Sequence, residues 1–388
     1  MNAAYGGAMR IITNEQVKQV LTMGMTLDAL RESYREVATG EGICRPRIDQ
    51  RIPTDRPDRF YLWSTMDGGS ANSGYFASRM VSDVRYSETY EGVRTSDEYC
   101  IRPGLWFGMV FLFNINNAEP LALLQDAYLQ RLRVGADAGL GVELLAKADA
   151  SVVGMLGSGG MARTYLEAFT LVRPIRSVQV YSPTKVNREA FAREMSEKFS
   201  IDVTAVDHPS EAYRGVDILA SCTDGGFFEN ANRAAHLGRY LQPGTHVVSN
   251  RGPLDADTVS RVDKALVLGR ATTPVGQPDV PNRPRDVYAP PADLPRFKEH
   301  TYFQEIYFEG VHVTNEKFPD PAKVLTMEDL ITGRHPGRTR DDEITFSERG
   351  SLQGAQFHAV AGRVYEAAVA RGLGHELPIE WFVEDERN

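Results

Sequence analysis

A glycine-rich segment at residues 157–162 carries the most definite chemistry in this sequence. An apolar, strand-like run precedes it and a helix-compatible stretch follows it. Strand, glycine turn and helix in this order are typical of a dinucleotide site. The first glycine permits the tight turn, the second leaves room for the pyrophosphate, and a small last residue lets the helix pack closely. The helix N-terminus then offers free N–H groups to the phosphates. The segment reads Gly157, Ser158, Gly159, Gly160, Met161 and Ala162.

The residues after the second expected strand of this unit bear on which dinucleotide is bound. NAD-specific sites usually have an acidic residue there, which binds the ribose 2′-hydroxyl. This sequence instead has Ser182, Thr184 and Lys185, with Arg188 one turn further on and no carboxylate before Glu189. Hydroxyl and basic side chains suit a 2′-phosphate, so NADP(H) is favoured over NAD(H). The alternative is that Lys185 and Arg188 simply begin a surface helix.

Other polar residues follow later expected strands of the same unit. Ligands of doubly wound parallel sheets bind beyond the carboxyl ends of the strands. We therefore expect Cys222, Thr223, Asn250 and Arg251 to line the pocket together with Ser182. A small residue packing beneath the nicotinamide is the favoured interpretation of Cys222, ahead of a nucleophile.

Several arginines lie before this unit. Arg45 and Arg47 belong to an arginine-rich segment of short β-like runs, where a guanidinium could bind a carboxylate through two hydrogen bonds. A solvated edge strand is the alternative for both. Arg133 lies in an expected helix at 127–147 with apolar residues on either side, which favours a buried, functional arginine.

Length and composition limit the protein class. The chain has 388 residues, which suggests about two domains, and a net charge of −9, which argues against nonspecific nucleic-acid binding. Three unpaired cysteines give no basis for a disulfide framework or a metal site. No apolar run approaches the roughly 18 residues of a membrane helix, and no secretory signal is evident. We expect a cytoplasmic protein without metal or membrane contacts.

The order of expected elements predicts an α/β protein: a Rossmann-type doubly wound parallel sheet plus an α+β cap or dimerisation domain. Residues 1–126 read as the first part of that cap, with a short strand and one helix within 9–40 and further strands after them. Residues 87–103 are polar and expected to be a loop. Residues 127–319 form the nucleotide-binding unit, with a proline-rich excursion at 270–319, and residues 320–388 return to the first domain.

Four motifs together resemble the ornithine cyclodeaminase/mu-crystallin family. They are LQRLRVGADAG at 129–139, GMLGSGGMA at 154–162, LQPGTHVVSNRG at 241–252 and TGRHPGRTRDDEITFSERGS at 332–351. The resemblance implies homodimers, a cap built from both chain ends, and reversible hydride chemistry at C–N bonds. The segment VYSPTK is similar to the NADPH-using, mu-crystallin-like members.

The resemblance also assigns roles to single residues. Arg47, with Arg45 as a rival, looks like the family's carboxylate-binding arginine, and Arg133 like its second carboxylate anchor. Arg79 stands where the family has an active-site lysine, and an arginine is a poor general base because it keeps its proton. The catalytic aspartate of cyclodeaminases is absent after Ser249. The expected catalytic residues are Arg79 and Arg133, and the expected substrate-binding residues are Arg45, Arg47, Arg79, Arg133, Asn250 and Arg251.

Together these features predict an NADPH-dependent oxidoreductase that reduces an imine of a 2-oxo acid, or dehydrogenates the amino acid in reverse. Its substrate would be a small amino or imino acid, and its proton donor water, Tyr75 or His358. One alternative is an NADP(H)-binding regulatory or accessory protein without turnover. Another is an ornithine cyclodeaminase-type lyase, which the loss of the lysine and the aspartate disfavours.

Overall fold

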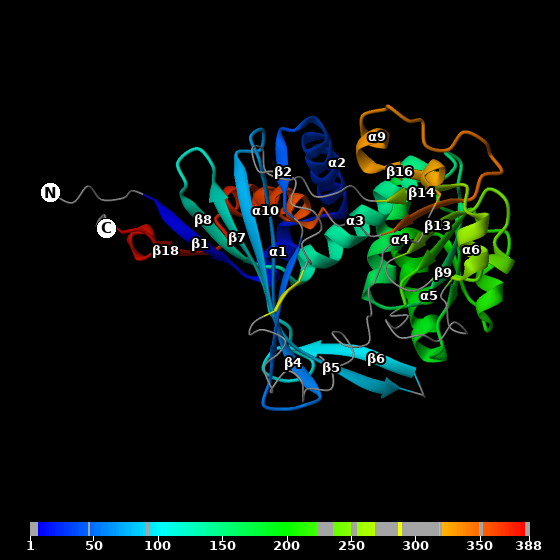
Figure 1. Cartoon of the computed structure of the whole chain (residues 1–388), viewed down its shortest axis with the longest axis horizontal. Coiled ribbons are helices and arrows are strands. Elements are labelled where there is room, and N and C mark those ends of the chain that lie inside the picture. The colour runs from blue at the N-terminus through cyan, green and yellow to red at the C-terminus, as the bar shows by residue number, and fades with distance from the viewer. Residues whose placement is uncertain are drawn as a thin grey trace.

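The computed structural model contains two β-sheets that lie next to each other, each with its own helices (Figure 1). Asn250, Arg251 and most of the proline-rich excursion fall outside the residues that the structure describes. The described residues are 7–45, 47–90, 93–223, 236–249, 254–267, 286–288, 318, 320–348 and 352–384.

The first sheet has ten strands in the order β15-β3-β4-β5-β7-β8-β1-β18, with β2 paired to β4 and β6 paired to β5. Antiparallel pairing dominates, and buried residues alternate with half-exposed ones along the long strands. The strands are β1 (Ala8–Ile12), β2 (Gly42–Cys44), β3 (Ile48–Pro53), β4 (Arg59–Ser70), β5 (Tyr75–Tyr90), β6 (Val93–Tyr99), β7 (Gly108–Asn114), β8 (Pro120–Gln125), β15 (Asp286–Tyr288) and β18 (His375–Pro378).

Helices α1 (Asn14–Val20), α2 (Met23–Thr39) and α10 (Gln353–Ala370) pack with this sheet. The expectation of a single helix within 9–40 is wrong, because the chain is extended at Leu21 and Thr22. The Thr22 hydroxyl accepts a hydrogen bond from Met25 N and so starts a second helix.

The polar stretch at 87–103 forms a β-hairpin, so the expected loop is also wrong. β5 continues to Tyr90 and pairs with β6, and Arg85 lies opposite Glu98 with 2.6 Å between their charged atoms. Charged residues are common on strands at the edge of a sheet, where they discourage pairing with other chains. Polarity therefore concealed the strand.

The second sheet is parallel throughout, in the order β11-β10-β9-β12-β13-β17-β14-β16. Helices α4 (Gly160–Val172), α5 (Lys185–Phe199), α6 (Ala256–Arg261) and α9 (Met327–Ile331) accompany it. A 3₁₀ turn, η1 (Pro209–Tyr213), lies between β11 and β12. The strands are β9 (Val152–Leu156), β10 (Ser177–Tyr181), β11 (Asp202–Ala205), β12 (Ile218–Ser221), β13 (His246–Ser249), β14 (Lys264–Val267), β16 (Val324–Thr326) and β17 (Thr345–Glu348).

The pairing differs from the expected domain division at one point. β16 and β17 come from the segment that was expected to return to the first domain, yet both pair in the second sheet. The chain rejoins the first sheet only with α10 and β18. The sequence of a short apolar strand does not show which of two sheets the strand pairs in. The expected boundary at residue 320 is therefore too early.

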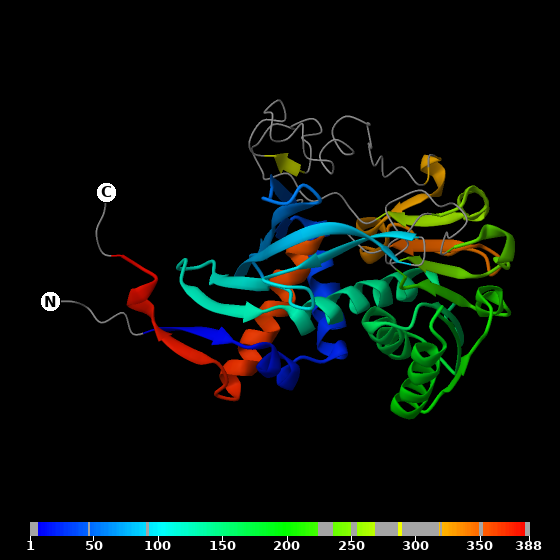
Figure 2. The same ribbon diagram turned by 90° about the horizontal axis from the view of Figure 1, so that it is seen from below.

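Helix α3 (Ala127–Leu145) joins the two parts and runs from the end of β8 toward the second sheet (Figures 1 and 2). Gly135 and Gly139 let it approach α4: an added Cβ at Gly135 would lie 2.7 Å from the Thr164 carbonyl oxygen, and one at Gly139 would lie 2.8 Å from the Ala168 Cβ. Its apolar residues enter two different hydrophobic cores, so α3 belongs to both parts.

Candidate active site

The glycine loop lies where β9 ends and α4 begins. Gly157 has a φ of +108°, and its N–H donates to the Tyr181 carbonyl oxygen at 2.7 Å. A Cβ there would lie 2.9 Å from the Cys222 carbonyl oxygen, so the position requires glycine. At Gly159 and Gly160, by contrast, an added Cβ would meet nothing within 4 Å. The loop is thus closed toward the sheet and open toward solvent.

The N-terminus of α4 has the features of an anion site. Gly159 occupies the N-cap position and no side chain caps the helix there, so the first N–H groups of this 13-residue helix remain available. Ala162 is fully buried against the sheet and Met161 is half-buried. An open glycine cradle in front of uncapped N–H groups fits the diphosphate of a dinucleotide.

The structure brings the other expected cofactor residues to the same edge of the sheet. Ser182 follows β10, while Cys222 and Thr223 follow β12, and both strands flank β9. The hydroxyls of Ser158 and Ser182 lie 2.8 Å apart, which ties the glycine loop to the end of β10.

The basic residues after β10 differ in their exposure. Thr184 and Lys185 are exposed. Arg188 is only 7% exposed, donates to the Ser182 carbonyl oxygen at 3.0 Å, and forms an ion pair with Asp207. Arg188 therefore holds the end of β10 through contacts within the protein. Of the two basic residues, Lys185 is the one exposed to solvent.

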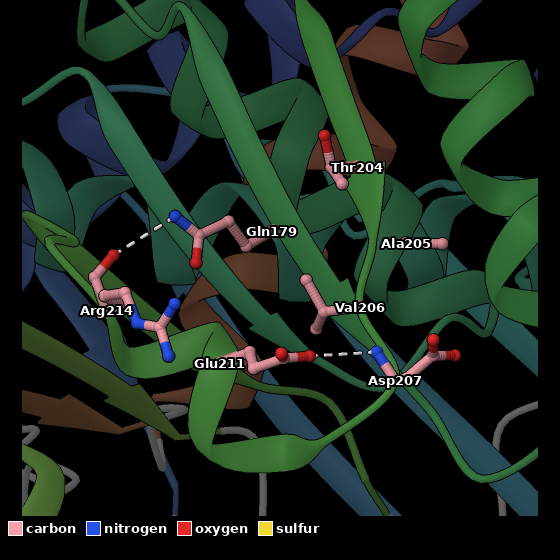
Figure 3. Close-up of a pocket in the computed structure, with 7 residues that line it drawn as sticks. All are labelled: Gln179, Thr204, Ala205, Val206, Asp207, Glu211 and Arg214. Carbon is pink, nitrogen blue, oxygen red and sulfur yellow. Dashed lines mark hydrogen bonds between the residues drawn. The ribbon is translucent and has the colours of Figure 1, made fainter.

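A cavity of about 420 Å³ lies nearby at the outer edge of the second sheet (Figure 3). Gln179 of β10 donates to the Arg214 carbonyl oxygen at 3.1 Å, and Glu211 accepts from Asp207 N at 3.1 Å. The lining residues therefore satisfy one another in part, and none of them belongs to the arginine cluster described next. The lining residues are Gln179, Thr204, Ala205, Val206, Asp207, Glu211 and Arg214.

Two buried arginines from different elements contact one aromatic ring. Arg79 of β5 and Arg133 of α3 place their guanidinium carbons 5.0 and 4.9 Å from the ring centre of Phe357 in α10. Arg79 Nε donates to Asp126 Oδ2 at 2.6 Å, and Arg133 Nη1 donates to Gln356 Oε1 at 2.6 Å. The aromatic face favours both cations, and the two predicted catalytic residues are thereby brought together.

Arg47 lies close to this pair. It donates to Asp49 Oδ1 at 2.5 Å and to Ser64 Oγ at 2.8 Å. Burial lowers the pKa of Arg47, Asp49 raises it, and the positive charges of Arg85 and Arg79 lower it further. Burial raises the pKa of Asp49, but Arg47 and Ser64 outweigh that effect and hold it below its usual value.

Arg45, the rival carboxylate ligand, lies elsewhere. Its guanidinium pairs with Asp67 and donates to Thr65 Oγ1 at 3.0 Å, and its side chain is 46% exposed. Asp67 and Thr65 are on the face of the first sheet opposite to Arg79, since Met66 lies across from Arg79. Arg47, and not Arg45, therefore lies with Arg79 and Arg133. These three arginines form the buried arginine cluster.

Sequence reasoning missed the carboxylates that accompany these arginines. Asp126 directly follows β8, and Asp83 follows Arg79 by four residues on the same face of β5. Asp83 is 3% exposed; burial and the charge of Glu98 raise its pKa to about 6, although Arg85, Arg79 and Arg47 act against this. A signal was available, because Arg79, Asp83 and Arg85 are spaced by even numbers of residues in one strand and so project from one face.

The two expected side-chain proton donors do not face the cluster. His358 is fully buried with its Nε2 3.4 Å from Ser33 Oγ of α2, and burial lowers its pKa to about 3. Tyr75 donates to Glu366 at 3.2 Å, and burial together with that carboxylate raises its pKa to about 12. Neither group can readily exchange a proton near neutral pH.

Asp255, the nearest described carboxylate after β13, has a structural role. It caps α6 by accepting a hydrogen bond from Thr258 N at 2.8 Å, and it also accepts one from Gly238 N of a neighbouring 3₁₀ turn at 3.0 Å. Within the described part of the chain, no group of three His, Cys, Asp or Glu residues could hold a metal ion. No described helix is long and apolar enough to cross a membrane.

Comparison with known proteins identifies the family. The sequence profile of the ornithine cyclodeaminase/mu-crystallin family matches residues 10–372, and the chain belongs to this family. Delta(1)-pyrroline-2-carboxylate reductase of Bacillus cereus is 28% identical over 278 residues, which cover 70% of this chain and 74% of that protein.

Solved structures share the fold over nearly the whole chain. The Delta(1)-pyrroline-2-carboxylate reductase of Thermococcus litoralis, solved with NADH and L-proline, superposes with a TM-score of 0.66 at 21% identity, covering 95% of this chain and 100% of that one. An archaeal alanine dehydrogenase dimer with bound NAD gives a TM-score of 0.68 at 20% identity, covering 96% and 99%. The Rossmann-type α/β fold is thereby confirmed.

Proposed function

We propose that this protein is an NAD(P)H-dependent oxidoreductase that reduces the C=N bond of an imine of a 2-oxo acid, or oxidises the amino acid in reverse. The observation that carries the proposal is the pair Arg79 and Arg133 on the ring of Phe357, in a chain whose glycine loop fits a dinucleotide. Buried guanidinium groups such as those of Arg79 and Arg133 suit the binding of a substrate carboxylate. The reductase relatives act on substrates of this kind.

Each part of the site has a distinct task in this reaction. The loop at 157–162 holds the diphosphate, and the bound cofactor supplies the hydride. Within the described residues, Nη2 of Arg79 and Nη1 of Arg47 donate no hydrogen bond and are available to a substrate carboxylate. Asp126 and Asp49 fix these arginines before the substrate arrives, which lowers the entropic cost of binding.

NADP(H) is the cofactor we propose, through the exposed Lys185 and the hydroxyls of Ser182 and Thr184. The described residues contain no carboxylate directly after β10 that would repel a 2′-phosphate; Asp207, which follows β11, is engaged by Arg188. The relatives of known structure bind NADH and NAD. Comparing NADPH with NADH affinity in wild type and Lys185→Ala tests this preference: the variant should lose NADPH affinity about tenfold and leave NADH affinity unchanged.

The protein should act as a homodimer through the half-exposed face of the first sheet. Tyr61 and Trp63 of β4, Met80 of β5 and Phe111 and Phe113 of β7 lie on this face, opposite to the buried cluster. A broad apolar surface of this kind usually meets a partner, and the alanine dehydrogenase neighbour is a dimer. Analytical ultracentrifugation should give twice the chain mass for wild type and a monomer for Trp63→Glu; a monomeric wild type refutes the proposal.

Fluorescence titration with NADPH, followed by NADPH oxidation with a panel of 2-oxo acids and amines, tests the function. Gly159→Asp should abolish binding without unfolding, because the new carboxylate enters open space in front of the diphosphate. Gly24→Asp is the matched control, since a Cβ at Gly24 also meets nothing within 4 Å. Binding without turnover on any pair indicates a regulatory protein, and ammonia release from ornithine indicates a cyclodeaminase.

A further inference from the structure

The arginine cluster lacks an obvious source for the proton that imine reduction consumes. Arg79 keeps its proton, and both His358 and Tyr75 point away from the cluster. We propose that Asp83 is the proton donor of the reaction, acting from the same face of β5 as Arg79. This inference rests on the proposed function, since it assigns a catalytic residue to that reaction.

The position of Asp83 is the first support. Arg79 and Asp83 are four residues apart in β5, so both side chains project from one face of the sheet, the face that Phe357 covers at Arg79. Asp83 is buried, and its Oδ2 lies 3.8 Å from Arg85 Nη2. Asp83 therefore places a buried carboxyl group on the face of β5 that also carries Arg79.

The charges around Asp83 come from three neighbouring strands. Arg79 and Arg85 share β5 with it, and Glu98 of β6 lies opposite Arg85 on the same face. On the β3 side, Arg47 acts on Asp83, and Arg51 lies in the same cross-strand row, beyond Leu62 of β4. Asp49 holds Arg47 and also lies 3.8 Å from Arg51. The cations thus have carboxylate partners of their own.

This environment suits a group that must both carry and release a proton. Burial and Glu98 favour the neutral acid and raise the pKa of Asp83 to about 6, while Arg85, Arg79 and Arg47 stabilise the carboxylate that remains after transfer. A general acid works best when its pKa is near the working pH, where both forms are present.

The step balances in atoms and electrons. The reductant NAD(P)H delivers a hydride, with two electrons, to the imine carbon. The C=N π electrons take the proton of Asp83, so an N–H bond forms as the carboxyl O–H bond breaks. Water then returns a proton to Asp83. The sum is imine, NAD(P)H and one proton giving amine and NAD(P)⁺, and the reverse reaction uses Asp83 as the base.

The test compares Asp83→Asn with a matched change outside the cluster, Asp67→Asn, whose carboxylate pairs with Arg45 on the opposite face. Asp83→Asn should lower kcat about 10²-fold or more, leave the NADPH dissociation constant unchanged, and remove the limb of the pH profile near 6. Infrared difference spectra should show a protonated carboxyl band that titrates near pH 6 in wild type and is missing from this variant. Asp67→Asn should keep the band, the turnover and the profile.

Glu98→Gln provides a second route, because its side chain is 42% exposed and its replacement should not disturb folding. Removing this charge should move both the infrared titration and the kinetic limb to lower pH. The role of Asp83 is overturned if wild type turns over and Asp83→Asn has the same kcat and pH profile. It is also overturned if the wild-type infrared band does not titrate near pH 6. Either result leaves the proposed function intact. Absence of turnover by wild type with every imine overturns the proposed function itself.

Discussion

Removing one partner of the ion pair between Arg79 and Asp126 should lower the free energy of unfolding strongly. The two side chains are 11% and 6% exposed and 2.6 Å apart. Neutralising Asp126 with the isosteric Asp126→Asn leaves the Arg79 charge buried without its counter-charge, which costs about 3–5 kcal/mol. Arg79→Met should cost a similar amount, because it strands the carboxylate. The double variant should recover most of this loss.

The pair Arg45 and Asp67 is the matched control, because it joins the same residue types in the same sheet but the Arg45 side chain is 46% exposed. Its coupling energy should be about 0–1 kcal/mol. Urea unfolding of the two double-mutant cycles, followed by circular dichroism, gives both coupling energies. If the Arg79–Asp126 coupling is no larger than that of Arg45–Asp67, the cluster is open to water and the reasoning about a desolvated site is refuted.

Three further predictions concern single residues. His358, whose pKa falls to about 3 on burial, must be protonated on unfolding below pH 6.5, so the unfolding free energy should drop by up to about 5 kcal/mol as the pH falls from 6.5 toward 3; His358→Gln should flatten this slope in urea titrations at each pH. Gly108→Ala should cost about 1–3 kcal/mol in the same assay, because the new methyl clashes with the Asp126 carboxylate, and an unchanged midpoint would contradict this contact. Gly157→Ala should weaken NADPH binding at least tenfold through its φ of +108°, whereas Gly160→Ala should alter it much less; equal effects would disprove the strained turn.

The nucleotide half was readable from the sequence because its signals are local. An apolar run, a glycine turn and a helix follow one another within about 20 residues at 152–172, and the structure places β9, the loop and α4 there. Parallel strands buried on both faces read as continuous apolar runs, as at Ile218–Ala220 of β12. The family resemblance rested on the same local motifs and is confirmed.

The substrate half was harder because its contacts are long-range. Arg79 and Asp126 are 47 residues apart, and Arg133 meets Gln356 across 223 residues, so no spacing rule connects them. Phe357 carried no sign of a role, because an aromatic residue in an apolar helix face usually belongs to the core. The arginines could be predicted from their residue type. The residues that hold them in place could be found only from the structure.

Helix α3 has a consequence for building chimaeras of this family. Leu129, Leu132 and Leu140 enter the core of the first part, while Val134 and Val142 enter that of the second, and its last carbonyl groups are bound by arginines from beyond α4 and from the loop after α9. A crossover at the nominal domain boundary would therefore separate a helix from half of its packing partners. The unit that can be exchanged between relatives is therefore α3 together with the residues that pack against it in both cores. A recombination library that is cut within β8 or after Leu145, and does not exchange these packing residues as well, should yield few folded proteins.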